Sequence, residues 1–304
     1  MSFNENVTLD TSQVESGGRG GSGGGPGGMV VGGGIGGIIM LILALLFGIN
    51  PNDIGGTATP APPVDAGGQQ SSGGFSECKT GADANKNTEC RIIGTVNSVQ
   101  AYWSTELPRY KRDWTPVKTV LYRGATQSAC GTASNQVGPF YCPLDKKVYL
   151  DASFFQILEQ RFGSSTGPLA QEYVVAHEYG HALQDQLGLL GRAQQDPQGP
   201  ESGAVRIELM ADCLGGVWAK HASTVPDDDT GKPFLKALTE QDIKDALSAA
   251  SAVGDDRIQE ATQGRVTPES WTHGSSEARM RWFLQGFKSG NLNQCDTFSV
   301  DSVN

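Results

Sequence analysis

Residues 171–186 read QEYVVAHEYGHALQDQ, and the interpretation of the whole chain starts from this stretch. Pro168 stands where the first residue of a helix commonly stands, and Gly188 follows the polar end of the stretch. The sequence therefore predicts a helix that begins at Pro168 and ends near Gly188. Residues four apart lie on one face of a helix, so the imidazoles of His177 and His181 are expected to face the same point.

His177, Glu178 and His181 form the pattern HExxH, which on a helix is typical of a zinc site. Two imidazoles one turn apart can bind one zinc ion (Zn²⁺), and Glu178 then points at the open side of the metal, where water binds. Zinc lowers the pKa of that water, and Glu178 can take its proton as the water attacks a carbonyl carbon. A helix with two incidental histidines is the alternative.

A catalytic zinc ion needs a third protein ligand, and the best candidate lies in RIELMAD, residues 206–212. Glu208 and Asp212 are four apart, so they share one face of a helix expected to begin near Ser202. Glu208 is expected to bind the metal, and Asp212 to accept a hydrogen bond from the second ring nitrogen of a zinc-bound histidine. Two hydrated carboxylates on an exposed face are the alternative, but the flanking residues are largely apolar.

Other polar residues are weaker candidates for the site. His273 precedes the last predicted helix, residues 275–288, and could stabilise the oxyanion of a tetrahedral intermediate or simply occupy the helix entry. Tyr179 is expected to pack in the core. The cluster Asp255–Arg257 is expected to be a structural ion-pair set, and His221 is given no catalytic role.

The remainder of the globular part predicts an α+β fold. Short apolar runs between Ile92 and Tyr149, such as KTVLYRG and KKVYLD, favour a few strands. Helical patterns follow from Asp151 onward, and Thr239 with Asp242 resembles a capping box. Short strands followed by a mostly helical catalytic core are therefore expected.

The first 75 residues differ in composition from the rest. Residues 1–28 and 50–75 are rich in Gly, Pro and Ser, which predicts a disordered tail and a flexible stalk. Between them, Met29–Ile49 carries no charge and would be roughly 31 Å long as a helix, enough to cross a bilayer. We therefore expect a transmembrane anchor ahead of a metallopeptidase domain at 76–304. A cleaved signal peptide, the alternative, would begin nearer the N-terminus.

The charges beside the apolar segment predict its orientation. Arg19 is the only Lys or Arg before it, and Lys79 is the first one after it. The positive-inside rule then favours a cytoplasmic N-terminus. The sequence thus predicts a single-pass protein of the cell membrane whose catalytic domain is extracytoplasmic.

All six cysteines follow the apolar segment, and an even number in an exported domain favours disulfides. Two pairs are each twelve positions apart, which leaves one long-range pair. The expected disulfides are Cys78–Cys90, Cys130–Cys142 and Cys213–Cys295. Buried free thiols are the alternative.

The formal net charge of the chain is −10 at neutral pH. Phosphate contacts need Lys and Arg, so an acidic domain binds nucleic acid poorly. No nucleic-acid partner is therefore expected.

Several longer stretches resemble the bacterial neutral zinc metallopeptidase family that is often called YpfJ-like. They are GPFYCPLDKKVYLDASFF, AHEYGHALQ, RIELMADCLGGVWA, VGDDRIQE and WTHGSSEARMRWFLQGF, and together they span about residues 95–298. HExxH followed by ExxxD is also similar to the gluzincin branch of zinc peptidases. The resemblance implies a minimal zincin-like domain with zinc ligands at His177, His181 and Glu208, and with Glu178 as the base.

These observations predict a membrane-anchored, zinc-dependent endopeptidase that acts on a peptide or protein substrate, with Glu178 as general base. Two alternatives stay open. One is a catalytically silent, zinc-stabilised interaction domain, although a purely structural site has no need for a base beside the metal. The other is a zinc amidase that acts on cell-wall peptides, which would use the same residues.

Overall fold

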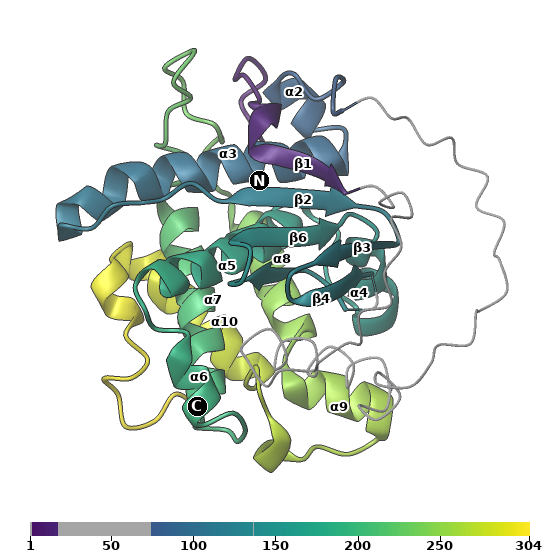
Figure 1. Cartoon of the computed structure of the whole chain (residues 1–304), viewed down its shortest axis with the longest axis vertical. Helices are drawn as coiled ribbons and strands as arrows, with labels where there is room; N and C mark the ends of the chain where they lie inside the picture. Colours follow the sequence, from purple (N-terminus) through teal and green to yellow (C-terminus); the bar gives the residue numbers. More distant parts are fainter. Residues whose placement is uncertain (1, 18–73, 136) are drawn as a thin grey trace, which may run out of the picture.

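The computed structural model describes residues 2–17, 74–135 and 137–304. Its main sheet has four strands in the order β1-β2-β6-β5 (Figure 1). β2 pairs in parallel with β1 on one side and with β6 on the other. β5 runs antiparallel to β6, and β3 pairs with β4 in a separate antiparallel hairpin. The strands are β1 (Val14–Gly17), β2 (Lys118–Tyr122), β3 (Ala125–Ser128), β4 (Gly131–Ser134), β5 (Phe140–Cys142) and β6 (Lys147–Asp151).

Helices make up most of the remaining described chain. The longer ones are α3 (Thr88–Glu106), α4 (Phe154–Phe162), α5 (Pro168–Gln186), α7 (Gly203–His221), α8 (Glu240–Ala252), α9 (Asp255–Gln263) and α10 (Ser276–Ser289). The short ones are α2 (Gly81–Ala84), α6 (Gly191–Gln195) and the 3₁₀ turns η1 (Thr11–Gln13), η2 (Leu107–Tyr110), η3 (Pro268–Ser270) and η4 (Leu292–Cys295). The α+β class is confirmed, and α5 has the predicted bounds.

The first long helix, α3, was expected to contribute strands and does not. Asn87 begins it by accepting hydrogen bonds from the backbone N–H groups of Glu89 and Cys90, at 2.8 and 3.2 Å. Every residue from Ile92 to Gln100 is buried, so the helix shows no polar face in this stretch. Polar residues such as Asn97, Ser98 and Gln100 are buried in it together with the apolar ones, so the spacing of apolar residues does not mark this stretch as a helix.

Helices α5, α7 and α10 pack closely, and glycines allow it. A Cβ atom at Gly216 of α7 would lie 2.1 Å from the carbonyl oxygen of Phe283 in α10. A Cβ atom at Gly286 of α10 would lie 1.9 Å from the carbonyl oxygen of Cys213 in α7. Where α5 meets α7, a Cβ atom at Gly180 would be 3.1 Å from the backbone of Ala211. The missing side chains let the three backbones approach, which fixes the faces that these helices present to one another.

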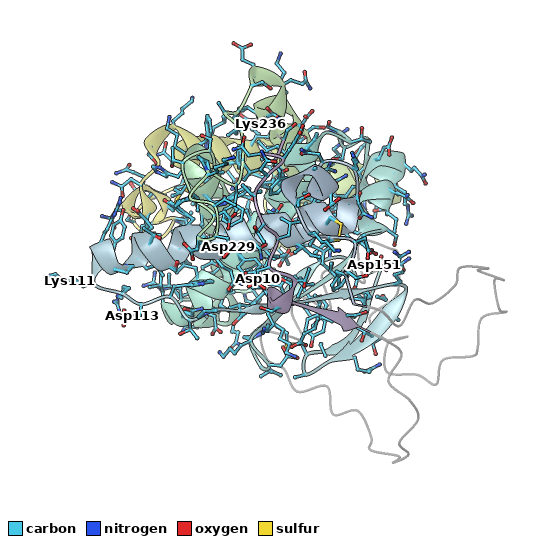
Figure 2. All side chains as sticks on the ribbon, turned by 90° about the horizontal axis from the view of Figure 1, so that it is seen from above. Asp10, Lys111, Asp113, Asp151, Asp229 and Lys236 are labelled. Atoms are coloured by element: carbon cyan, nitrogen blue, oxygen red, sulfur yellow. A yellow bond between two sulfur atoms is a disulfide. The ribbon has the colours of Figure 1, made fainter. Side chains whose placement is uncertain are left out.

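The N-terminal segment belongs to the fold, so the expected disordered tail over residues 1–28 is wrong for residues 2–17. Phe3 and Val7 are fully buried, and Gly94 of α3 leaves the space that the Phe3 ring occupies. The segment ends in β1, whose residues Val14–Gly17 pair with β2. Figure 2 shows Asp10 of this segment close to Asp229, and both residues line one groove.

The membrane arrangement predicted from the sequence is contradicted. In the parts of the chain that the structure describes, none of the helices has the length and apolar character that crossing a membrane requires. The expected anchor Met29–Ile49 lies outside the described residues, as does the expected stalk up to residue 73. A single crossing between β1 and β2 would also put these strands on opposite sides of a membrane, whereas they pair in one sheet. The prediction of a cytoplasmic N-terminus ahead of an exported domain at 76–304 is therefore wrong.

All three expected cysteine pairs are joined as disulfides, and no cysteine of the described chain is free. Cys78–Cys90 and Cys130–Cys142 are local. Cys213–Cys295 links α7 to η4 and so ties the helix that carries Glu208 to the C-terminal segment.

Candidate metal centre

Helices α5 and α7 bring His177, His181 and Glu208 together at one point. One ligand atom from each lies within 4.8 Å of the other two. The two Nε2 atoms are 3.1 Å apart, and the Glu208 carboxylate oxygens lie 3.2 Å from His177 Nε2 and 3.4 Å from His181 Nε2. All three side chains are buried.

The second ring nitrogen of each histidine already has an acceptor. His177 Nδ1 is 2.8 Å from Asp212 Oδ1, and His181 Nδ1 is 2.8 Å from Gln184 Oε1. Because these Nδ1 atoms donate, both Nε2 atoms carry lone pairs, and these face each other and the Glu208 carboxylate. Three electron-pair donors that converge in a buried place can hold a cation between them, and two imidazoles with one carboxylate suit Zn²⁺.

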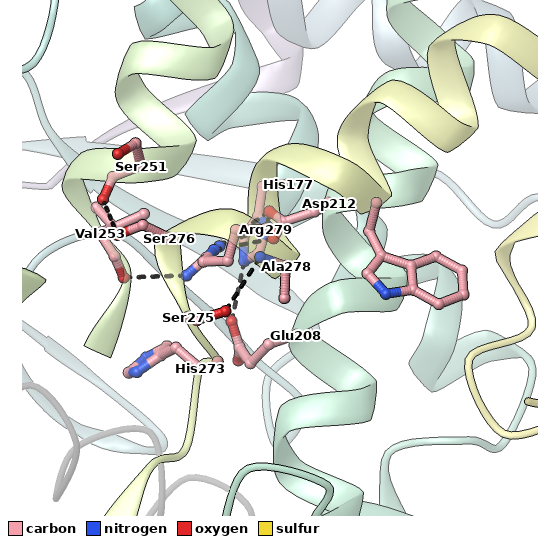
Figure 3. A network of polar contacts seen from close by, with 12 residues as sticks. His177, Glu208, Asp212, Ser251, Val253, His273, Ser275, Ser276, Ala278 and Arg279 are labelled. Atoms are coloured by element: carbon pink, nitrogen blue, oxygen red, sulfur yellow. Dashed lines mark hydrogen bonds and ion pairs between the residues drawn. The ribbon is translucent and has the colours of Figure 1, made fainter. Parts of the chain in front are cut away.

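Asp212 joins this site to α10. Its carboxylate accepts hydrogen bonds from Tyr173 Oη, from His177, and from Arg279 Nε and Nη2, the last two at 2.9 Å each. Figure 3 shows Arg279 reaching from α10 toward Asp212, while its Nη1 donates to the Val253 carbonyl oxygen at 3.3 Å. Burial by itself would raise the pKa of Asp212, but Arg279 and then His177 hold it below its usual value. The carboxylate therefore stays ionised while fully buried.

Three residues of this network were not identified from the sequence. Tyr173 lies one turn before His177 on the same face of α5, and Gln184 lies one turn after His181, so helical spacing could have indicated both. Arg279 lies on the buried stripe of α10 with Phe283 and Gly286. An arginine on the apolar face of an amphipathic helix is a signal for a buried carboxylate partner.

Glu178 follows His177 in α5 and lines the same cleft. It is buried, and burial raises the pKa of its carboxyl group, while the neighbouring histidines oppose the rise. Burial would likewise raise the pKa of Glu208, but His181 and His273 hold that pKa well below its usual range. The two carboxylates of the cleft thus have different environments.

His273 also lines the cleft, and Asp255 fixes its position. Asp255 Oδ1 lies 3.1 Å from His273 Nδ1, and Oδ2 accepts the backbone N–H groups of Thr272, His273 and Gly274 at 2.6–3.0 Å. Burial would lower the pKa of His273, but Asp255 and Glu208 raise it above its ordinary value. Asp255 and Asp256 thus hold the loop before α10, since Asp256 accepts from Ser276, rather than forming the ion-pair set expected with Arg257.

The side chains of Tyr179 and His221 pack against other parts of the fold. Tyr179 is fully buried, and its hydroxyl lies 2.9 Å from Thr119 Oγ1, in agreement with a packing role. The His221 ring stacks on Tyr102 with ring centres 5.3 Å apart, and its Nε2 lies 3.0 Å from the carbonyl oxygen of Gly290. His221 therefore packs between α3 and the end of α10.

Comparison with known proteins agrees with this site. The family model described as "Putative neutral zinc metallopeptidase" matches residues 4–298. "Uncharacterized protein Rv2575" of Mycobacterium tuberculosis is 52% identical over 301 residues, which cover 99% of each chain. "Uncharacterized protein YpfJ" of Escherichia coli K12 is 38% identical over 266 residues, 86% of each chain. No solved structure matches this chain.

Proposed function

Since this chain belongs to the family described as "Putative neutral zinc metallopeptidase", we propose that it is a zinc-dependent endopeptidase. His177, His181 and Glu208 would hold the metal. The observation that carries the proposal is the convergence of two Nε2 lone pairs and one carboxylate in a buried cleft, with both Nδ1 atoms already bonded.

Zinc bound there would supply Lewis acidity, which lowers the pKa of a water molecule and polarises the carbonyl of a peptide bond. Glu178 takes the proton of the attacking water on its carboxylate and delivers it to the leaving amine. The carboxylate is available for this task because Glu208, and not Glu178, completes the ligand group.

The groups around the ligands orient them. Asp212 and Gln184 hold the rings of His177 and His181 so that each Nε2 faces the metal position. Tyr173 and Arg279 hold Asp212 in turn. The ligands therefore need little rearrangement when the metal enters.

His273 is placed to stabilise negative charge on the substrate oxygen. Its Nδ1 lies against Asp255, so the ring, when it is protonated, can donate from Nε2 into the cleft that Glu178 also lines. His273→Ala should retain zinc while kcat falls by about 10²–10³-fold, as for removal of an oxyanion donor. Unchanged kcat in the zinc-loaded variant would assign His273 to the loop structure alone.

Metal removal tests the proposal as a whole. The full-length protein should contain one zinc ion per chain and cleave members of a peptide library at internal bonds. A chelator should abolish cleavage and added zinc should restore it. Stoichiometric zinc without cleavage of any peptide would favour the interaction-domain alternative, and cleavage confined to cell-wall peptides would favour the amidase.

A further inference from the structure

The cleft beside the metal ligands has an apolar wall built from several elements. Its members are Pro139 and Phe140 at the start of β5, Phe154 of α4, Val174 of α5 and Val253 at the end of α8. Val174 lies one turn before Glu178 on α5, so the wall adjoins the side chain that serves as base. A substrate residue next to the scissile bond would therefore lie against this wall.

The polar groups of the cleft are engaged with one another. Both guanidinium contacts of Arg279 to Asp212 are 2.9 Å long, and the hydroxyl of Tyr173 also donates to Asp212. His273 is paired with Asp255. Among the described residues that line the cleft, the positive groups thus have carboxylate partners, and Glu178 and Glu208 would repel a further carboxylate.

Desolvation decides which substrate side chain fits such a wall. A charged side chain would lose its hydration against Phe154, Val174 and Val253, and these three side chains offer it no counter-ion. Burying a side chain of leucine size instead improves binding by about 10- to 100-fold over glycine.

We propose that the cleft formed by Pro139, Phe140, Phe154, Val174 and Val253 is the pocket for an uncharged, apolar side chain of the residue that flanks the scissile bond. The substrates of this site are then peptides cleaved beside residues of the leucine or valine class. This inference rests on the proposed function, because it assumes that zinc is bound at His177, His181 and Glu208.

Binding of small probes tests the pocket without relying on turnover. The probes are hydroxamates that carry a Leu, Gly, Asp or Lys side chain on the carbon next to the zinc-binding group. Calorimetry with the full-length, zinc-loaded protein should give a Kd for the Leu probe at least about tenfold below that of the Gly probe. The Asp and Lys probes should bind no better than the Gly probe.

A larger side chain at Val253 should fill the pocket, and the same substitution outside the cleft serves as the control. Val253 is only partly buried, and its side chain takes no part in the contacts that hold Arg279 (Figure 3). Val253→Phe should bring the Leu probe to within about threefold of the Gly probe, at unchanged zinc content. Val266→Phe, the same change at an exposed position that does not line the cleft, should keep the Leu preference.

The outcomes separate this inference from the function on which it rests. A protein that binds no zinc would contradict the proposed function. A zinc-loaded protein that prefers the Asp or Lys probe, or that binds none of the probes, would contradict the apolar pocket alone. If Val253→Phe kept the full preference for the Leu probe, the pocket for the substrate side chain could not lie beside Val253.

Discussion

The carboxylate of Asp212 accepts hydrogen bonds from His177, Tyr173 and Arg279 at once. It is fully buried, so its charge depends on these partners for stabilisation. Such a group has two separate effects, because it holds the ring of His177, a proposed metal ligand, and neutralises a buried guanidinium.

Asp212→Asn should therefore lower both zinc affinity and stability. The amide keeps the shape of the side chain but leaves Arg279 buried without a counter-charge, which costs about 3–5 kcal/mol. Zinc affinity should fall by about 10–100-fold, as for loss of a carboxylate behind a ligating histidine. Competition with a chromogenic chelator measures the affinity, and urea unfolding measures the stability.

Asp256→Asn provides the control, because Asp256 bonds Ser276 outside the ligand group. Its zinc affinity should equal that of the wild type. Equal zinc affinity in Asp212→Asn would show that Asp212 does not orient His177.

The proposed metal ligands, Glu178 and Asp212 could be predicted from the sequence, whereas Arg279, which holds Asp212, was not. The spacing within HExxH and between Glu208 and Asp212 is set by a single helical turn, so the pattern is visible in the sequence. Arg279 meets Asp212 across 67 positions of sequence. Contacts of that kind depend on how helices cross, which no local spacing encodes.

At the scale of elements, the crossing of α7 and α10 positions the site. Gly286→Ala would place a methyl group 1.9 Å from the Cys213 carbonyl oxygen, so one helix must move. We expect a loss of about 1–3 kcal/mol in the free energy of unfolding, as for other overpacked interfaces. Urea unfolding of the zinc-loaded protein measures it.

Gly191→Ala is the matched substitution. Gly191 begins α6, and a Cβ atom there meets nothing within 4 Å. It should be neutral or stabilising by about 0.5–1 kcal/mol, because alanine restricts the unfolded chain. Equal stability of Gly286→Ala and Gly191→Ala would show that the α7–α10 contact is looser than the backbone distances indicate.

Helices and strands that carry capping residues or a clear apolar run were predicted from the sequence, whereas the buried helix α3 was not. α5 and the capping box of α8 follow from proline, threonine and aspartate at fixed positions. β2 and β6 follow from KTVLY and KVYLD. The helix α3 is buried from Ile92 to Gln100 on all sides, so its sequence lacks the periodicity that marks a helix.

At the scale of the whole molecule, residues 2–17 complete the sheet and the core. Asn4 N–H donates to the Phe234 carbonyl oxygen at 2.9 Å, and Leu9 N–H donates to the Lys79 carbonyl oxygen at 3.0 Å. The glycine-rich composition of the first 75 residues concealed this short ordered segment. Its partners lie far along the chain, and only the folded structure brings them together.

Phe3→Ala tests whether this segment contributes to stability. The ring is fully buried beside Gly94, so its removal should lower the free energy of unfolding by about 3–5 kcal/mol. Leu144→Ala, at a side chain that is 70% exposed, should change it by less than about 0.5 kcal/mol. Equal effects of the two substitutions on the free energy of unfolding would show that the N-terminal segment does not pack in the core in solution.

The central claim is that Glu178 works as a base beside a zinc ion held by three other residues. Glu178→Gln tests it most directly, because glutamine keeps the size and hydrogen-bonding capacity of the side chain and cannot accept a proton. Zinc content and peptide turnover are to be measured on the same preparation, next to the wild type. We predict one zinc ion per chain in both proteins and a fall in turnover of at least about 10²–10⁴-fold in the variant. Loss of zinc from Glu178→Gln, or full zinc with unchanged turnover, would contradict the claim.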